Sequence, residues 1–497
     1  MKSPTTKFWG AEIYSGANRF GRYQSHGTLE IMYEGTLAAS GYPTTTDGGG
    51  WDWNVIPGAT TVHYTSWVDM MPAQNTTQRF DQWTKTKNFA GALSWGQYGV
   101  FAADFDQIDR WSSEHFIPTN LEFKKSVFAF DDMLISLGSD INASGTYSDD
   151  MITATNLFQG IQSDISGDFI VNGSTVSEGY DSEVSSSQDV WMITPQSTGF
   201  YIPQGNDNIV IKYGSQTTPL QTGADAANPT TTVVAAKAYI NHGVKTQDKQ
   251  YYFVAVPDAT HEKMQVVANN IANNVFEVKY HNSAVHALEY KPQNITAYSV
   301  FESVDTLTTG LLKAATSQML LMVSHEADSN YADFAVNNPN LEPTADDVFG
   351  WVSVPTYAGI IIEGQWEKKS GDASITTAIN GDETLVTMTL LEGLPTYFDL
   401  QKAGNAGAET RAAVSVIEEA VSKGYEVRKT GNGCEIQFKN ILSNDTQVRF
   451  IDIKGRIVLE KKAKAGTSIL SVDNLNRGIY VIQVVSPEIN ESVKFIL

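Results

Sequence analysis

The pattern of hydrophobic residues constrains this chain more than any other feature. Periodicity typical of helices is scarce across its 497 residues, and short alternating or apolar runs are separated by clusters of Gly, Asn, Asp and Ser. Such runs, at this density and without regular helices between them, predict β-sandwiches or barrels. The clearest predicted strands lie at 28–33, 125–137, 208–213, 251–256 and 384–391.

Two stretches have helical character. Residues 260–273 open with a threonine suited to a helix N-cap, and residues 409–423 end at Gly424, which suits a C-cap. The chain exceeds the length that one core usually organises, so several domains are expected. Changes in composition predict a lead-in segment at 1–34, a large antiparallel β-sandwich at 35–290, a smaller β-sandwich at 291–402, a linker with a helix at 403–430 and a small C-terminal β-sandwich at 431–497.

The charge and cysteine content limit the partners of the chain. Its net charge of −22 argues against nucleic acid, because a phosphate backbone requires a basic surface. A polyanionic sugar would need a local basic patch within this acidic chain. The single cysteine, Cys434, cannot form a disulfide within the chain. We expect no transmembrane segment, since no apolar run reaches ~20 residues, and the start MKSPTTKFWG lacks the apolar part of a signal peptide.

The first candidate site is the segment 12–27, EIYSGANRFGRYQSHG. It gathers a carboxylate, an amide, two guanidinium groups and an imidazole in one short stretch. Arginine and asparagine suit the recognition of a carboxylate or sulfate, because the planar guanidinium donates two parallel hydrogen bonds. Asn18, Arg19 and Arg22 are therefore candidates for substrate binding. A strand–turn–strand with solvated charges is the alternative that composition alone leaves open.

This segment resembles the motif with which polysaccharide lyases of the chondroitinase/hyaluronate lyase family pass from a helical toroid into a β-sandwich. Glu12 matches the family's active-site glutamate, and Asn18 matches the last asparagine of the turn that follows. Gly21 and Gly27 match the family's glycines, whereas Ser15 stands where many members have asparagine. The phrase RFGRYQSHG is most similar to the chondroitin ABC lyase branch.

Three further stretches follow in the order that the family has. Residues 56–61, IPGATT, resemble its Pro-Gly-Thr-Thr turn. Residues 124–132, KKSVFAFDD, resemble its Lys-Lys-Ser-Trp-Phe strand, which residues 134–139 continue. The resemblance extends more weakly to about residue 402 and implies the family's sandwich architecture for this part of the chain.

The resemblance implies β-elimination at a uronic acid. The carboxylate is neutralised, a base removes the adjacent proton, and an acid protonates the leaving oxygen. In the family the base and acid are a tyrosine and a histidine on the toroid, which also supplies an asparagine and an arginine for the carboxylate. Glu12 would orient that arginine rather than transfer a proton. Only 11 residues precede Glu12, so we expect the toroid and these four groups to be missing and the isolated chain to be inactive.

The second candidate is the loop 47–54, DGGGWDWN. Exposed indole faces stack on sugar rings and glycines allow close approach, so Trp51 and Trp53 are candidate sugar contacts. The alternative is a turn whose tryptophans fill the sandwich. Asp47 and Asp52 could hold a structural divalent cation, but the spacing is not that of a calcium loop. We therefore predict no metal site and expect no cofactor.

The other polar residues form no recognisable catalytic pattern. The pairs Asp131–Asp132 and Asp149–Asp150 are predicted to be turn residues rather than acid pairs. Six histidines lack the spacing of zinc ligands: His63, His242, His261, His281, His286 and His325.

The tail, 431–497, contains a hairpin pattern with Lys454-Gly455 at the turn, followed by LNRGIYVIQV at 475–484. Its residues by themselves predict only a small β-sandwich. Its Gly-Arg and Arg-Gly-Ile-Tyr turns closely resemble the C-terminal sorting domain of the type IX secretion system of Bacteroidetes. The resemblance implies secretion or cell-surface display through that machinery. A sorting tail without a signal peptide leads us to expect that the natural N-terminus, with its signal and toroid, is not in this chain.

These features together predict an all-β chain that forms the β portion of a chondroitin ABC lyase-like enzyme. The expected substrate is an acidic polysaccharide: chondroitin sulfate, dermatan sulfate or hyaluronan. The other candidate is a secreted carbohydrate-binding β protein without catalytic activity.

Overall fold

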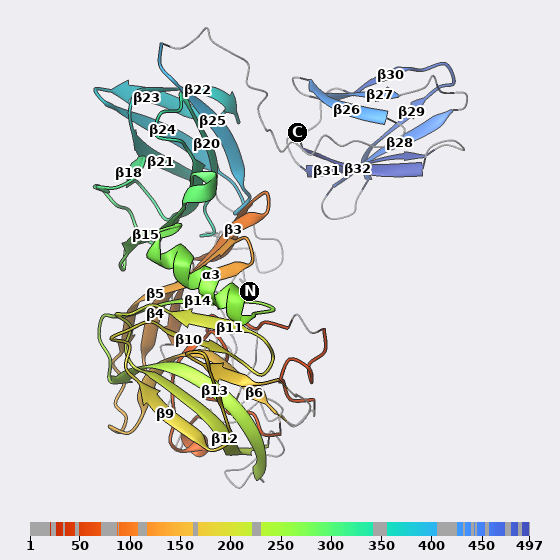
Figure 1. The fold of residues 1–497 in the computed structure, drawn as a ribbon. Helices are drawn as coiled ribbons and strands as arrows, with labels where there is room; N and C mark the ends of the chain where they lie inside the picture. Colours follow the sequence, from red (N-terminus) through yellow and green to blue (C-terminus); the bar gives the residue numbers. More distant parts are fainter. Residues whose placement is uncertain are drawn as a thin grey trace. The chain divides into compact units, whose positions relative to one another are not determined.

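The computed structural model describes residues 20, 26–32, 35–44, 49–70, 87, 89–107, 117–162, 167–220, 230–340, 355–404, 425–430, 433–438, 442, 445–452, 457–472, 479–485 and 490–496. The chain divides into two compact units, Met1–Ala406 and Gly407–Leu497. Strands dominate both units, which confirms the all-β prediction (Figure 1). The helix expected at 409–423 lies outside the described residues. Among the described residues, no helix has the length and apolar composition needed to cross a membrane.

The first unit begins with two facing antiparallel sheets. The five-stranded sheet runs, in spatial order, β1 Thr60–Val62, β6 Ile152–Ile161, β13 Thr230–Val244, β12 Ile209–Pro219 and β9 Tyr180–Val184. The nine-stranded sheet runs β2 Ala90–Trp95, β3 Tyr98–Gln107, β4 Leu121–Phe130, β5 Met133–Ala143, β14 Lys249–Val256, β11 Gly199–Ile202, β10 Val190–Ile193, β7 Phe169–Val171 and β8 Ser174–Val176. A short helix, α1 (Trp67–Met70), follows β1.

Strand β4 carries apolar side chains on both of its faces. Successive side chains of a strand point to opposite faces, so Phe123 joins the core between the first two sheets and Phe128 joins a second core on the other side. Both faces of the nine-stranded sheet are therefore covered. The run expected at 125–137 is two strands joined by a turn at Asp131–Asp132, where Asp131 has a φ of 48°. The turn role expected for this acidic pair is confirmed.

Helix α3 (His261–Ala272) and a third sheet close the second core. The Lys263 amide donates to Thr260 Oγ1 at 3.2 Å, which confirms the expected N-cap. Met264 and Val267 are buried in the second core. In Figure 1 the helix lies between β11 and β14 on one side and β15 on the other.

The third sheet has seven antiparallel strands. In spatial order they are β15 Phe276–His281, β16 Val285–Tyr290, β17 Ile295–Val300, β19 Met319–Ser324, β20 Tyr331–Asn337, β25 Thr396–Lys402 and β22 Trp366–Gly371. A 3-10 turn at Lys291–Gln293 joins β16 to β17. Because these two strands pair along their whole length, the change of sheet lies before Phe276 and not at residue 290, where composition placed it.

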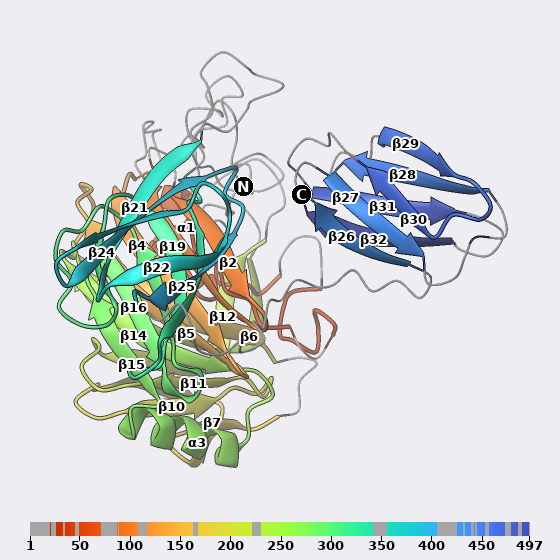
Figure 2. The ribbon, with the colours of Figure 1, turned by 90° about the horizontal axis from the view of Figure 1, so that it is seen from above.

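The fourth sheet completes a stack of four layers. Its order is β18 Leu312–Ala315, β21 Thr356–Glu363, β24 Glu383–Leu390 and β23 Thr376–Asn380. A third core fills the space between it and the seven-stranded sheet, with Tyr298 and Phe334 facing Ile360 and Met388. Figure 2 shows β21 and β24 in front of the strands of the other layers.

The second unit is a small two-sheet β-sandwich. One sheet contains β26 Tyr425–Thr430, β27 Gly433–Phe438 and β30 Ile469–Val472, and the other contains β29 Ile457–Ala463, β28 Thr446–Asp452, β31 Ile479–Val485 and β32 Asn490–Ile496. Its core includes Cys434, Ile436, Phe450 and Ile482, and the cysteine is a free thiol. Strands β28 and β29 pair as the expected hairpin; its turn lies outside the described residues.

Candidate functional site

Most of the lead-in motif lies outside the described residues, including Glu12, Asn18, Arg19 and Arg22. Phe20 is described and is only 1% exposed. Its ring stacks on Trp53 with 5.8 Å between centroids and meets Trp67 edge-on at 6.2 Å. The motif is therefore anchored in the sandwich by the aromatic residue that lies between its candidate substrate-binding positions.

Lys125 is the group on which three of the family-like stretches converge. It lies on β4 with 1% exposure, and its Nζ donates to the backbone oxygens of Gly27 and, at 2.6 Å, Gly58. Gly27 ends the lead-in motif, Gly58 belongs to the Pro-Gly turn, and Lys125 belongs to the Lys-Lys-Ser strand. Stretches separated by up to 98 positions thus share one ammonium group. Desolvation by burial lowers the pKa of Lys125 to about 7.

The Pro-Gly turn and the segment after the motif are in close contact. The Leu29 amide donates to Pro57 O at 2.9 Å. Gly58 has a φ of +74°, and a Cβ there would lie 2.4 Å from Leu29 Cβ, so glycine is required by conformation and by contact. The strand expected at 28–33 is wrong for residues 28–32, which form no ladder and rest on this turn.

The two candidate sugar-binding tryptophans are core residues. Trp51 and Trp53 are 4% and 5% exposed. Trp51 stacks on Tyr42 with 5.3 Å between centroids, and Trp53 Nε1 donates to Pro219 O at 3.4 Å. Both tryptophans therefore fill the core of the sandwich, as in the alternative interpretation of this loop. The burial gives no support to stacking of a sugar on an open indole face at these positions.

Asp52, between the tryptophans, is engaged by protein groups. Its Oδ2 lies 2.5 Å from Lys237 Nζ, and its Oδ1 accepts from the Asn54 amide at 3.0 Å. Asp47, its suggested partner for a cation, lies outside the described residues. Within the described part of the chain, no group of three or more His, Cys, Asp or Glu side chains is arranged to hold a metal ion.

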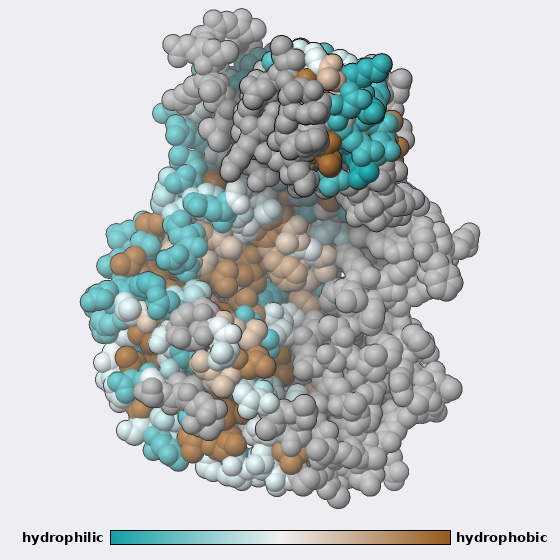
Figure 3. All heavy atoms as spheres, turned by 90° about the vertical axis from the view of Figure 1, so that its right-hand side faces the viewer, coloured by the Kyte–Doolittle hydropathy of each residue, from teal (hydrophilic) through white to brown (hydrophobic). Residues whose placement is uncertain are grey.

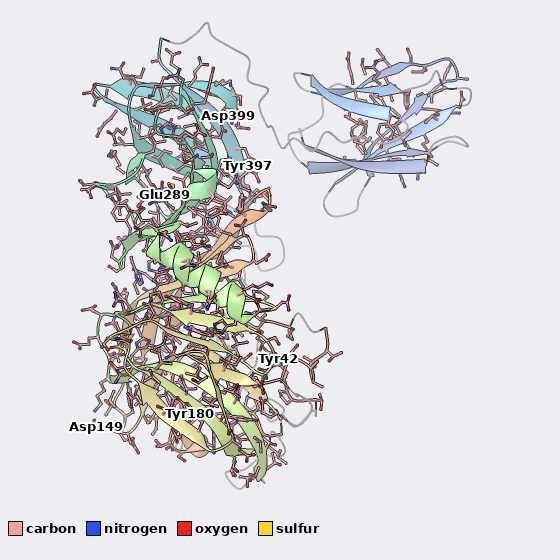
Figure 4. The ribbon with its side chains drawn as sticks, in the orientation of Figure 1. Tyr42, Asp149, Tyr180, Glu289, Tyr397 and Asp399 are labelled. Atoms are coloured by element: carbon pink, nitrogen blue, oxygen red, sulfur yellow. The ribbon has the colours of Figure 1, made fainter. Side chains whose placement is uncertain are left out.

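A groove of about 430 Å³ lies on the five-stranded sheet. Six of its lining residues have side chains suited to contacts with a sugar: Asp52, Trp67, Tyr180, Lys212, Gln216 and Lys237. Figure 4 labels Tyr180, which lies at the start of β9. Trp67 connects the groove to Phe20 and hence to the lead-in motif. No local pattern in the sequence identifies this group, because its members come from three strands, helix α1 and a loop.

His242 has neighbours in the order of a catalytic triad. Thr155 Oγ1 lies 2.9 Å from His242 Nε2, and His242 Nδ1 lies 2.9 Å from Asp207 Oδ2, which is the order of a nucleophilic triad. Thr155 is fully buried, and its hydroxyl also lies 2.9 Å from Thr60 Oγ1. Burial lowers the pKa of His242. These groups therefore satisfy one another inside the sandwich.

His286 has a similar structural role. Its ring nitrogens lie 2.9 Å from Ser126 Oγ and 2.8 Å from Ser139 Oγ. All three residues are fully buried. The bonds tie β4 and β5 to β16, that is, the nine-stranded sheet to the seven-stranded sheet.

Exposed hydrophobic side chains do not single out another site. On the face shown in Figure 3, brown patches of the described residues are interrupted by white and teal ones. Among the described residues, Tyr357 is the most exposed large hydrophobic residue at 82%, and Val266, on helix α3, follows at 54%. Scattered exposed apolar groups are normal on protein surfaces.

Comparison with known proteins agrees with this architecture. Residues 1–268 match the polysaccharide lyase family 8 super-sandwich domain, and residues 431–497 match a secretion system C-terminal sorting domain. The chondroitin sulfate ABC endolyase of Proteus vulgaris is 29% identical over 399 residues, which cover 80% of this chain and 36% of the endolyase. The chain thus spans about a third of the length of this relative.

Solved structures of low sequence identity share the fold. The Streptomyces coelicolor A3 chondroitin AC lyase aligns with a TM-score of 0.58 at 15% identity, over 81% of this chain and 48% of that one. A Paenibacillus xanthan lyase aligns with a TM-score of 0.61 at 16% identity, over 98% and 49%. The sorting domain indicates a secreted or cell-surface protein. Because the family match covers more than half of the chain, and the stretches that carry the resemblance meet at Lys125, this chain belongs to polysaccharide lyase family 8.

Proposed function

We propose that this chain is the β portion of a glycosaminoglycan lyase that cleaves chondroitin or dermatan sulfate, or hyaluronan, by β-elimination at a uronic acid. The observation that carries the proposal is the convergence on Lys125 of the lead-in segment and the Pro-Gly turn. Through the same contact the sandwich holds Gly27, which ends the segment that bears Glu12. The relationship to the Proteus vulgaris chondroitin sulfate ABC endolyase supports the substrate class.

The division of labour follows from the chemistry. Elimination needs neutralisation of the uronate, a base for its neighbouring proton and an acid for the leaving oxygen. In the proposal a helical toroid of the family type supplies the tyrosine, histidine, asparagine and arginine for these steps. Glu12 orients that arginine, and Asn18, Arg19 and Arg22 contact the acidic substrate. A displacement of ~1 Å in such groups can cost about 100-fold in rate, so a firmly held lead-in segment matters for catalysis.

The decisive experiment joins this chain to a toroid. A helical toroid of the family type is fused ahead of Glu12, and unsaturated uronate from chondroitin sulfate is followed by its ultraviolet absorbance. The chimera should form product, and Glu12→Gln should lower kcat about 100-fold, as expected when preorganised charge is lost. A folded chimera that binds chondroitin sulfate and forms no unsaturated uronate contradicts the proposal.

A second candidate function is carbohydrate binding without catalysis. The groove on the five-stranded sheet favours it, because polar and aromatic side chains line a cavity of a size typical of ligand sites, roughly 300–1,000 Å³. Binding by the chain, together with an inactive chimera, is the result that this candidate predicts.

We also propose that the sorting domain directs export by the type IX machinery of Bacteroidetes. The match of residues 431–497 to a C-terminal sorting domain supports this route. In a Bacteroidetes host, the chain preceded by a signal peptide should reach the cell surface. Removal of residues 431–497 should abolish delivery, and normal export without them contradicts the assignment.

A further inference from the structure

The groove has a floor of small residues between larger polar ones. Gly214 on β12 pairs with Ala235 on β13, and the neighbouring pair on the same face is Lys212 with Lys237. A Cβ on Gly214 would meet only the Gly179 backbone, at 3.5 and 3.8 Å. The sheet surface is therefore hollow at this point and has room for a side chain or a ligand.

The two lysines differ in how firmly they are held. Lys237 is paired with Asp52 at 2.5 Å, and both side chains are largely buried. Lys212 is paired with Asp181 at 3.2 Å, with side chains 41% and 66% exposed. An exposed pair of this kind contributes about 0–1 kcal/mol, so an incoming anion can replace Asp181. Like charges directly across a strand pair are unfavourable, and an anionic ligand would relieve this repulsion.

Two buried oxygen atoms along the same strand are left without partners. Gln216 Nε2 donates to Gly50 O at 2.7 Å, but Gln216 Oε1 accepts no hydrogen bond from the described residues. Thr218 Oγ1 is likewise buried and unpaired within the described part of the chain. Both residues line the groove and are 7% and 1% exposed. A buried oxygen without a donor is costly, about 1–3 kcal/mol, and sugar hydroxyl groups can donate to it.

We infer that this groove is a binding subsite for an acidic oligosaccharide, in which Lys212 receives a carboxylate or sulfate and Gln216 and Thr218 accept from sugar hydroxyl groups. Lys212, Gly214, Gln216 and Thr218 occupy alternate positions of β12 and so share one face. They extend over about 20 Å, at ~3.3 Å per residue. The inference deepens the proposed function and rests on its assignment of an acidic polysaccharide as the substrate.

Two variants and one control test the subsite in the full chain. Lys212→Ala removes the exposed cation, and Gly214→Leu fills the hollow without a strained backbone. Lys245→Ala is the matched control, because Lys245 also pairs with an exposed aspartate, Asp149, at 2.8 Å. Lys245 follows directly after the end of β13, eight residues beyond Lys237 and about 25 Å away at ~3.3 Å per residue. Unfolding midpoints followed by tryptophan fluorescence establish that each variant folds.

Binding of a fluorescent chondroitin sulfate hexasaccharide is then measured by anisotropy at low ionic strength. Lys212→Ala should weaken binding about tenfold because it removes one charge-assisted contact. Gly214→Leu should weaken binding about tenfold because its side chain occupies the hollow, and Lys245→Ala should leave binding unchanged. Unsulfated chondroitin should retain the dependence on Lys212 if the carboxylate is the group received, and lose it if the sulfate is. Maltohexaose, which has no charge, should bind without dependence on Lys212.

Three results overturn the subsite: binding unchanged by Gly214→Leu, equal losses in Lys212→Ala and Lys245→Ala, or no binding by the wild-type chain at millimolar ligand. The assay does not use the elimination reaction. An active chimera with groove-independent binding therefore refutes the subsite alone. An inactive chimera with groove-dependent binding refutes the proposed catalytic function and leaves the subsite standing.

Discussion

Replacement of Lys125 by methionine gives a direct test of its role in the fold. The ammonium is fully buried, and burial lowers its pKa to about 7 from 10.5. A lysine whose pKa is lowered in the folded state stabilises least at low pH, because folding must then release its proton or bury its charge. Between pH 7 and 10.5 the unfolded chain binds more protons, so stability rises with pH across this window and is lost as pH falls towards 7.

The size of the effect follows from the pKa difference. For one group with these two pKa values, proton linkage lowers the free energy of unfolding by about 4 kcal/mol at pH 7 and by about 2 kcal/mol at pH 9. The free energy of unfolding of the wild-type first unit should therefore rise by about 2 kcal/mol between pH 7 and pH 9. Lys125→Met removes this rise. It also leaves the oxygens of Gly27 and Gly58 without their donor, at about 1–3 kcal/mol each.

The assay is urea unfolding followed by tryptophan fluorescence. All ten tryptophans precede residue 407, so the signal reports the first unit only. Lys124→Met is the control, since Lys124 lies next to Lys125 on β4 but bonds to Ser283 O, and the variant should keep the wild-type rise. A flat wild-type profile from pH 7 to 9, or a rise that survives in Lys125→Met, would contradict the burial of a titrating Lys125.

Three further predictions concern stability. Burial lowers the pKa of His63 to about 4, so the stability that the neutral imidazole contributes is lost as pH falls from 6.5. His63→Gln should therefore reduce the loss of unfolding free energy between pH 6.5 and 4 by about 3 kcal/mol. An unchanged acid profile in this variant contradicts the prediction. Gly58→Ala should destabilise by more than about 2 kcal/mol in urea unfolding, whereas Gly35→Ala, with a similar φ of +83° and open space, should cost about 1 kcal/mol; equal effects would show that contact with Leu29 is unimportant. Truncation after Gly404 keeps β25 and the hydrogen bond from the Ala403 amide to Gln365 O. The fluorescence-detected melting temperature of the first unit should therefore shift by less than ~2 °C. A large drop would show that the tail stabilises the first unit.

The fold was largely predictable because periodicity and turn chemistry act locally. Alternation and apolar runs located β12, β14 and β24, and the threonine cap located helix α3. Composition does not record strand pairing, so it could not show that β16 and β17 pair across residue 290. Residues 28–32 have strand-like composition, but their contact with the Pro-Gly turn replaces a ladder.

The site was less predictable because burial is a tertiary property. Composition does not distinguish a tryptophan that faces a sugar from one that fills a core, and Trp51 and Trp53 are core residues. Lysine is almost never fully buried. The Lys-Lys-Ser motif therefore includes Lys125 but does not predict that it donates from the core to Gly27 and Gly58. The alternation of β4 does predict burial of Lys125. It occupies the same set of alternate positions as Leu121 and Phe123, whose side chains lie in the core. The groove residues of β9, β12 and β13 meet only through strand pairing.

The most direct test of the account is whether the purified chain forms unsaturated uronate from chondroitin sulfate. Absorbance and mass spectrometry of the products are compared for the chain alone and for the chimera with a toroid. The proposed function predicts product from the chimera and none above background from the chain alone, because in that proposal a toroid of the family type supplies the proton-transferring groups. Clear formation of unsaturated uronate by the chain alone would contradict it.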